Sequence, residues 1–208
     1  DGKIVVAHGS MHPDKSVYKD KGIKRVEIQK TKLAKIHEIP LENGEHMPTL
    51  EEYLSQTQKD PYTKLIIEMK DGLTPKKESD FVKRVVKLVK KYDLYLFSDE
   101  VYREYIYTGS PYISACHLEG IEQNVVLIDS VSKRYSECGI RIGALITKNE
   151  EVRKAVMKFC QARLSPPLIG QIVAEASFDT PQDYMLEMYN EYVERRKFLI
   201  DGLNRIPG

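Results

Sequence analysis

Five polar residues in the second half of the chain combine side chains that could carry out one kind of chemistry. They are Asp99, Tyr102, Ser130, Lys133 and Arg141. A lysine amine forms a Schiff base with an aldehyde, and an acidic side chain keeps a heterocyclic nitrogen protonated. Hydroxyl and guanidinium groups bind phosphate. Each residue alone has an ordinary surface explanation, but together they predict a site for pyridoxal phosphate, an aldehyde cofactor with a phosphate group.

The spacing of these residues resembles that of a known enzyme family. Ser130–Lys133 reads SVSK, Gly139–Gly143 reads GIRIG, and Ser98–Tyr102 reads SDEVY. This order resembles the lysine motif and the strand-end D-x-x-Y motif of fold-type I pyridoxal-phosphate aminotransferases, the relatives of aspartate and aromatic aminotransferases. The similarity extends over residues 93–208.

The resemblance implies a role for each matching residue. Asp99 would pair with the pyridine nitrogen of the cofactor, and Tyr102 with its ring hydroxyl. Lys133 would form the Schiff base and move the proton between the substrate carbon and the cofactor. The cofactor-binding set would be completed by Ser130, Arg141 and the neighbouring Ser132, with the first two holding the phosphate. The implied reaction is transamination between an amino acid and a 2-oxo acid, in a homodimer acting on small molecules.

Other motifs of the aminotransferase family are not found in this sequence. The upstream phosphate-binding loop, the asparagine segment and the arginine that binds the substrate carboxylate are missing. We therefore expect transamination to be impaired or absent in this chain. Residue 1 is Asp rather than Met, and the sequence starts within an apolar run. This predicts a fragment of a longer protein or a composite of two proteins joined near Tyr92.

Residues 1–92 resemble a different family. Asp1–His8 (DGKIVVAH), Asn43–Leu54 (NGEHMPTLEEYL) and Thr63–Lys70 (TKLIIEMK) are similar to strand and loop segments of glycerophosphodiester phosphodiesterases, which are TIM barrels. The resemblance implies that His8 is a catalytic acid and that Glu68 binds a divalent metal, Ca²⁺ or Mg²⁺. Lys70 would contact the substrate phosphate. The alternative is that these three are ordinary polar residues at strand ends.

Two further functions therefore stand beside transamination. One is metal-dependent hydrolysis of a phosphoric diester, although the first histidine motif and the E-x-D carboxylate pair of that family are missing. The other is a composite or fragment without catalysis.

Hydrophobic periodicity predicts the elements that position these residues. Short apolar runs predict strands at 4–8, 65–69, 94–97, 125–128 and 140–147. Thr49 and Glu52 have the spacing of a capping box at a helix start. Further helices are expected from Ser79 and over 150–163, 167–178 and 181–205. Alternating strands and helices indicate an α/β protein with a mostly parallel sheet. The predicted fold is an incomplete aminotransferase large-domain sheet with helices over 93–208, preceded by a partial (β/α) barrel-like segment over 1–92.

Composition limits the partners of the chain. With 32 basic and 31 acidic residues among 208, the net charge of +1 argues against nucleic-acid binding by bulk charge. No apolar run reaches the roughly 20 residues that a membrane span needs. The three cysteines lack a paired motif, so we expect free thiols in the cytoplasm. The spacing of His12, His37, His46 and His117 predicts no zinc site.

Overall fold

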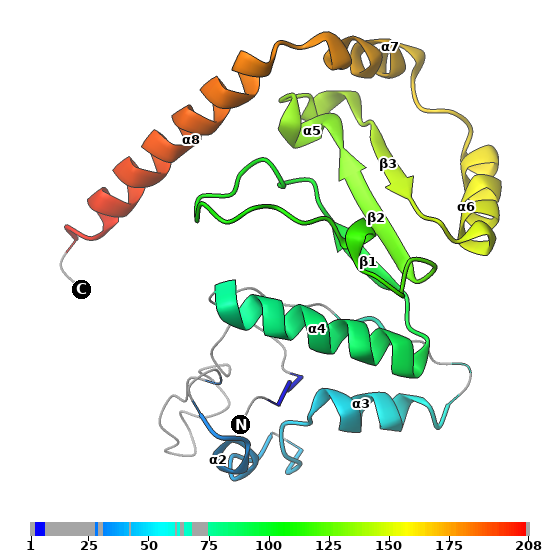
Figure 1. The fold of residues 1–208 in the computed structure, drawn as a ribbon, viewed down its shortest axis with the longest axis vertical. Coiled ribbons are helices and arrows are strands. Elements are labelled where there is room, and N and C mark those ends of the chain that lie inside the picture. Colours follow the sequence, from blue (N-terminus) through cyan, green and yellow to red (C-terminus); the bar gives the residue numbers. More distant parts are fainter. Residues whose placement is uncertain are drawn as a thin grey trace. The chain divides into compact units, whose positions relative to one another are not determined.

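The computed structural model describes residues 3–6, 28, 31–41, 43–60, 62, 65–67 and 75–206 (Figure 1). The chain divides into two compact units, Asp1–Thr74 and Pro75–Gly208, which are described separately.

The second unit is organised by a three-stranded sheet in the order β1-β2-β3. Its strands are β1 (Leu96–Asp99), β2 (Val125–Ser130) and β3 (Gly143–Ile146). β1 and β2 are parallel, as expected, but β2 and β3 are antiparallel, so the mostly parallel prediction is wrong for this pair. The segment between β2 and β3 contains only the four-residue helix α5 (Val131–Arg134) and a 3₁₀ turn, η3 (Cys138–Ile140). That is too little helix for the crossover that a parallel neighbour requires.

The core of the second unit lies between the sheet and helix α4 (Pro75–Tyr92). Val89 of this helix packs with Ile121 and Val125, and all three side chains are buried. The compact units separate after Thr74, so α4 belongs to the second unit, whereas the segment boundary inferred from the sequence after residue 92 stays a prediction. The physical reason is that the apolar face of α4 is buried against residues of the sheet unit.

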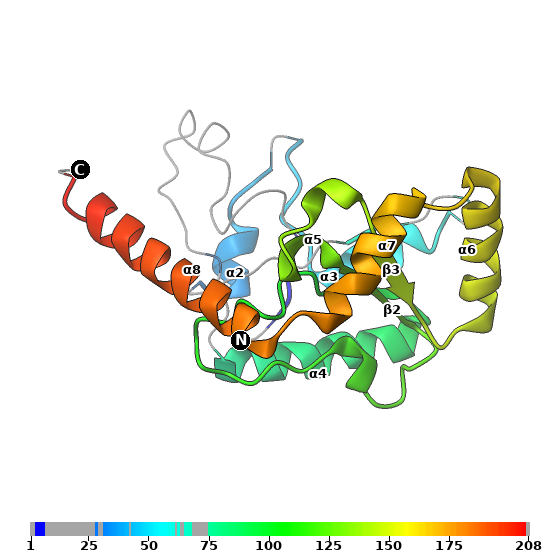
Figure 2. The ribbon, with the colours of Figure 1, turned by 90° about the horizontal axis from the view of Figure 1, so that it is seen from above.

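The remaining helices of the second unit lie close to their predicted ranges. They are α6 (Glu150–Arg163), α7 (Leu168–Ala176) and α8 (Gln182–Leu203), with the 3₁₀ turns η2 (Ala115–His117) and η4 (Ser177–Asp179) elsewhere in the unit. Asn149 caps α6, because its side chain accepts a hydrogen bond from the Val152 amide at 3.0 Å. Figures 1 and 2 show α8 leading away from the sheet. It is tied to the segment after β1 by Tyr189, whose hydroxyl donates to the Ile106 carbonyl at 3.1 Å. Among the helices that the structure describes, none is long and apolar enough to cross a membrane.

The first unit contains two described helices, α2 (Leu33–His37) and α3 (Leu50–Thr57). The predicted capping box of α3 is confirmed: Thr49 accepts from the Glu52 amide, and the Glu52 carboxylate accepts from the Thr49 amide at 2.7 Å. The barrel-like prediction for this segment is not supported. The described residues before Pro75 contain no strand, only isolated antiparallel bridges from Val5 to Thr49 and from Pro40 to His46.

Ile121 tests the core of the second unit, because its side chain is only 1% exposed. Ile121→Ala should lower the free energy of unfolding by about 3 kcal/mol, since it leaves a cavity between α4 and the sheet. Ile113→Ala is the matched control, because Ile113 is 71% exposed and its truncation should cost under about 0.5 kcal/mol. Urea unfolding of both variants measures the difference. Equal losses would contradict this assignment of the core.

Candidate active site

Strand pairing brings three distant segments to one edge of the sheet. Asp99 pairs in register with Ile128 at the carboxyl end of the parallel strands. Ser130 pairs with Gly143, so the start of antiparallel β3 lies beside the end of β2. Figure 1 shows α5 directly beyond this end of β2. In α/β sheets, the carboxyl edge of the strands is where ligands bind.

Lys133 lies in α5 and faces an aromatic ring. Its Nζ is 5.7 Å from the centroid of the Tyr102 ring. The hydroxyl of Tyr105 donates to the Lys133 carbonyl at 2.9 Å and so holds the backbone of α5. Burial raises the pKa of Tyr105, and neighbouring tyrosines raise it further, so the phenol stays protonated as a donor.

Ser130 and Ser132 form a hydroxyl pair at the start of α5. Their Oγ atoms are 2.7 Å apart, and Ser130 Oγ also accepts from the Ser132 amide at 3.0 Å. Ser130 Oγ lies 3.0 Å from the carbonyl oxygen of Ile142, to which it can only donate. This hydrogen bond links the end of β2 to Ile142, the residue just before β3.

Asp99 and Arg141 are both exposed at this edge, and each has a hydrogen bond close by in sequence. Asp99 Oδ1 accepts from the Val101 amide at 3.2 Å. Arg141 donates through Nη1 to the Cys138 carbonyl at 2.8 Å. Its backbone has φ 60°, the left-handed region that arginine adopts rarely and that is often found at functional sites. The Asp99 carboxylate and most guanidinium donors of Arg141 remain accessible to a ligand.

Four charged residues beside Lys133 form a cluster that sequence reasoning missed. Arg103 Nη1 is 2.8 Å from Asp129 Oδ2, and Arg134 Nη2 is 3.2 Å from the same oxygen. Glu104 Oε1 is 2.5 Å from Arg134 Nε and 3.2 Å from Arg103 Nε. Burial raises the pKa of Glu104, against the attraction of Arg103. Asp129 and Arg134 flank the serine–lysine motif, but their Arg103 and Glu104 partners follow another strand, so no local pattern revealed the cluster.

Three further candidate residues were predicted from the phosphodiesterase resemblance of the first segment. His8, Glu68 and Lys70 lie outside the described residues, and their proposed roles stay predictions.

Comparison with known proteins identifies the family. Residues 72–208 match the family model described as "Aminotransferase class I and II". The chain belongs to the class I and II aminotransferase family. This aminotransferase chain is 29% identical over 116 residues to an aspartate aminotransferase of Rhizobium meliloti, covering 55% of this chain and 28% of the relative. A valine–pyruvate aminotransferase of Mycobacterium tuberculosis is 34% identical over 116 residues, covering 55% of this chain and 29% of the relative.

Solved structures agree with the aminotransferase fold. The crystal structure of the Rhizobium meliloti aspartate aminotransferase aligns with TM-score 0.56 and 27% identity, covering 62% of this chain and 33% of that one. The aminotransferase chain thus spans less than a third of the length of the curated relatives described above. Nothing in these similarities supports the phosphodiesterase resemblance of residues 1–92.

Arg134 tests the charged cluster beside Lys133. Its side chain is 18% exposed, and Arg134→Ala would leave two partly buried carboxylates with only Arg103 as a partner. We expect a loss of about 2 kcal/mol in the free energy of unfolding. Arg153→Ala is the matched control, because Arg153 is 65% exposed in its ion pair with Glu150 and should cost under about 0.5 kcal/mol. Denaturant unfolding measures both; an equally mild effect of Arg134→Ala would show that the cluster contributes little.

Proposed function

We propose that this chain carries the cofactor-binding lysine of a pyridoxal-phosphate aminotransferase, and that Lys133 is that residue. The observation that carries the proposal is the half-buried Lys133 with its Nζ 5.7 Å from the Tyr102 ring, at the carboxyl edge of a sheet of this family. An amine beside an aromatic ring at such an edge is suited to a flat aldehyde ligand.

The side chains at this edge fit the cofactor in chemical type. Pyridoxal phosphate, when bound, supplies an aldehyde and a ring that withdraws electrons from the reacting carbon. The hydroxyls of Ser130 and Ser132 and the guanidinium of Arg141 are donors for its phosphate. The exposed Asp99 carboxylate is the acid for its ring nitrogen, and the Tyr102 hydroxyl a partner for its ring oxygen.

Lys133 would act in two ways at this site. Its amine would hold the cofactor when no substrate is present, and it would then move a proton at the substrate carbon. Both tasks need the amine to keep a fixed position. The Tyr105 bond to the Lys133 carbonyl and the ion pairs of Arg134, the next residue, restrain the short helix that carries it.

The relatives guide the proposal for substrates and partners. One relative is named for aspartate and another for valine and pyruvate. We propose transfer of an amino group between an amino acid and a 2-oxo acid, both small molecules, by a cytoplasmic homodimer. Weak or absent turnover by this chain alone stays a prediction, to be measured by amino-group transfer.

Lys133→Ala tests the cofactor site directly. The purified chain is mixed with pyridoxal phosphate and reduced with borohydride, and the modified peptide is found by mass spectrometry. We expect the wild-type chain to carry the label on Lys133 and Lys133→Ala to lose it. The matched control is Lys148→Ala, which removes an exposed lysine after β3 and should keep the label.

Two results would contradict the proposal. One is a label spread over many lysines in the wild-type chain, which would indicate nonspecific reaction. The other is equal labelling of Lys133→Ala, which would place the reactive amine elsewhere.

A further inference from the structure

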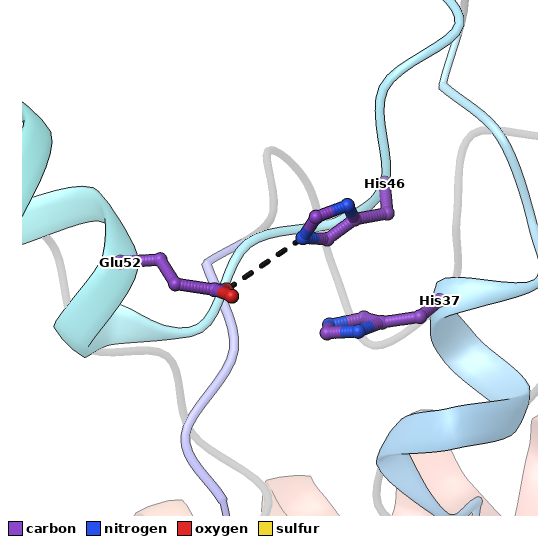
Figure 3. Close-up of side chains that lie close together, drawn as sticks. All are labelled: His37, His46 and Glu52. Carbon is purple, nitrogen blue, oxygen red and sulfur yellow. Dashed lines mark ion pairs between the residues drawn. The ribbon is translucent and has the colours of Figure 1, made fainter.

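Three polar side chains of the first unit, none of them part of the site described above, lie close together. His37 is the last residue of α2, His46 follows a turn, and Glu52 lies in the first turn of α3 (Figure 3). The turn is closed by hydrogen bonds from the Leu41 amide to the Glu45 carbonyl at 2.6 Å and from the Gly44 amide to the Leu41 carbonyl at 2.9 Å. This turn returns the chain so that His46 lies against His37.

The ligand atoms of these residues lie close together. One nitrogen of each histidine and one oxygen of Glu52 are all within 4.8 Å of one another. The ring centroids of His37 and His46 are 4.2 Å apart, and His46 Nε2 is 3.7 Å from Glu52 Oε2. Ligands of a tetrahedral zinc ion at about 2.0–2.1 Å would be about 3.4 Å apart. An approach of at most about 1.4 Å between two ligand atoms would therefore bring them to this separation.

The observation that points most specifically to a metal ion concerns one ring nitrogen of His37. Its Nε2 is buried and has no hydrogen-bond partner among the described residues. A buried nitrogen of this kind calls for an explanation, and a metal ion can satisfy a lone pair that no donor reaches. His46 lies on the side open to solvent, with 49% of its side chain exposed.

Glu52 is already oriented as a ligand. Its Oε2 accepts from the Thr49 amide at 2.7 Å and from the Thr49 hydroxyl at 2.9 Å. These hydrogen bonds from Thr49 lower the pKa of Glu52. Hydrogen bonds to a metal-binding carboxylate fix its direction and improve binding.

We propose that His37, His46 and Glu52 form a binding site for a divalent metal ion of the zinc type. Two imidazole nitrogens and one carboxylate oxygen are a ligand set that zinc favours, whereas Ca²⁺ and Mg²⁺ prefer oxygen. With His46 and Glu52 half exposed, the fourth position is open to water. Sequence spacing predicted no zinc site here, because the histidines are nine positions apart and only the turn brings them together.

The test is zinc binding by the full 208-residue chain, measured by competition with a chromophoric chelator. We expect one Zn²⁺ per chain in this site. His37→Ala and His46→Ala should each weaken its binding by more than about 100-fold, because loss of an outer-shell group alone costs 10–100-fold. His117→Ala is the matched control: it removes an exposed histidine of the second unit and should bind zinc as the wild type does. Glu52→Gln should weaken binding, and Glu119→Gln, which changes another exposed carboxylate, should not.

X-ray absorption at the zinc edge identifies the ligand atoms in the wild-type chain. This measurement tests the proposal even if a variant fails to fold. Two imidazole ligands and no sulfur are expected, which separates this site from the free thiols of Cys116, Cys138 and Cys160. Sulfur ligation, no binding by the wild type, or unchanged binding by folded His37→Ala and His46→Ala would each overturn the proposal. Lys133→Ala should bind zinc normally, so this result is independent of the cofactor proposal.

Discussion

The pairing of β2 with both of its neighbours is the constraint on which the candidate active site depends. Parallel pairing with β1 places Asp99 near the end of β2, and antiparallel pairing with β3 brings Gly143 opposite Ser130. Segments separated by about 40 residues in the sequence thereby meet at one edge. A one-residue slip would turn every side chain of the slipped strand to the other face of the sheet.

Polar interactions then hold the ends of these strands. The cluster of Arg103, Glu104, Asp129 and Arg134 joins the segment after β1 to α5. Buried Glu100 works beside it by accepting hydrogen bonds from Ser98, Tyr112, Ser114 and the Ala115 amide. Such groups are costly to bury unless every partner is present. The ion pairs of Arg134 with Glu104 and Asp129 restrain the backbone next to Lys133, which the proposed cofactor site requires.

In the first unit, too, polar interactions hold a candidate site in one arrangement. The capping box of α3 satisfies the Thr49 amide and orients the Glu52 carboxylate with the same two hydrogen bonds. Glu52, in the first turn of α3, thus also presents an acidic oxygen to two histidines (Figure 3). Helix capping and ligand positioning share one side chain here, because a carboxylate has more acceptor positions than the cap requires.

Local patterns in the sequence determined much of this protein. The SVSK and GIRIG motifs indicated the aminotransferase family that residues 72–208 confirm. The Thr49–Glu52 capping box and the helix at 150–163 formed as predicted, because these features depend on neighbours a few residues away. Tertiary structure decided the features that join remote segments. The antiparallel β3, the attachment of α4 to the sheet unit, the ion pairs of Arg134 with Glu104 and the meeting of His37 with His46 are all of this kind. Strand register and side-chain burial set these contacts, and both are properties of the folded chain rather than of any local stretch of residues.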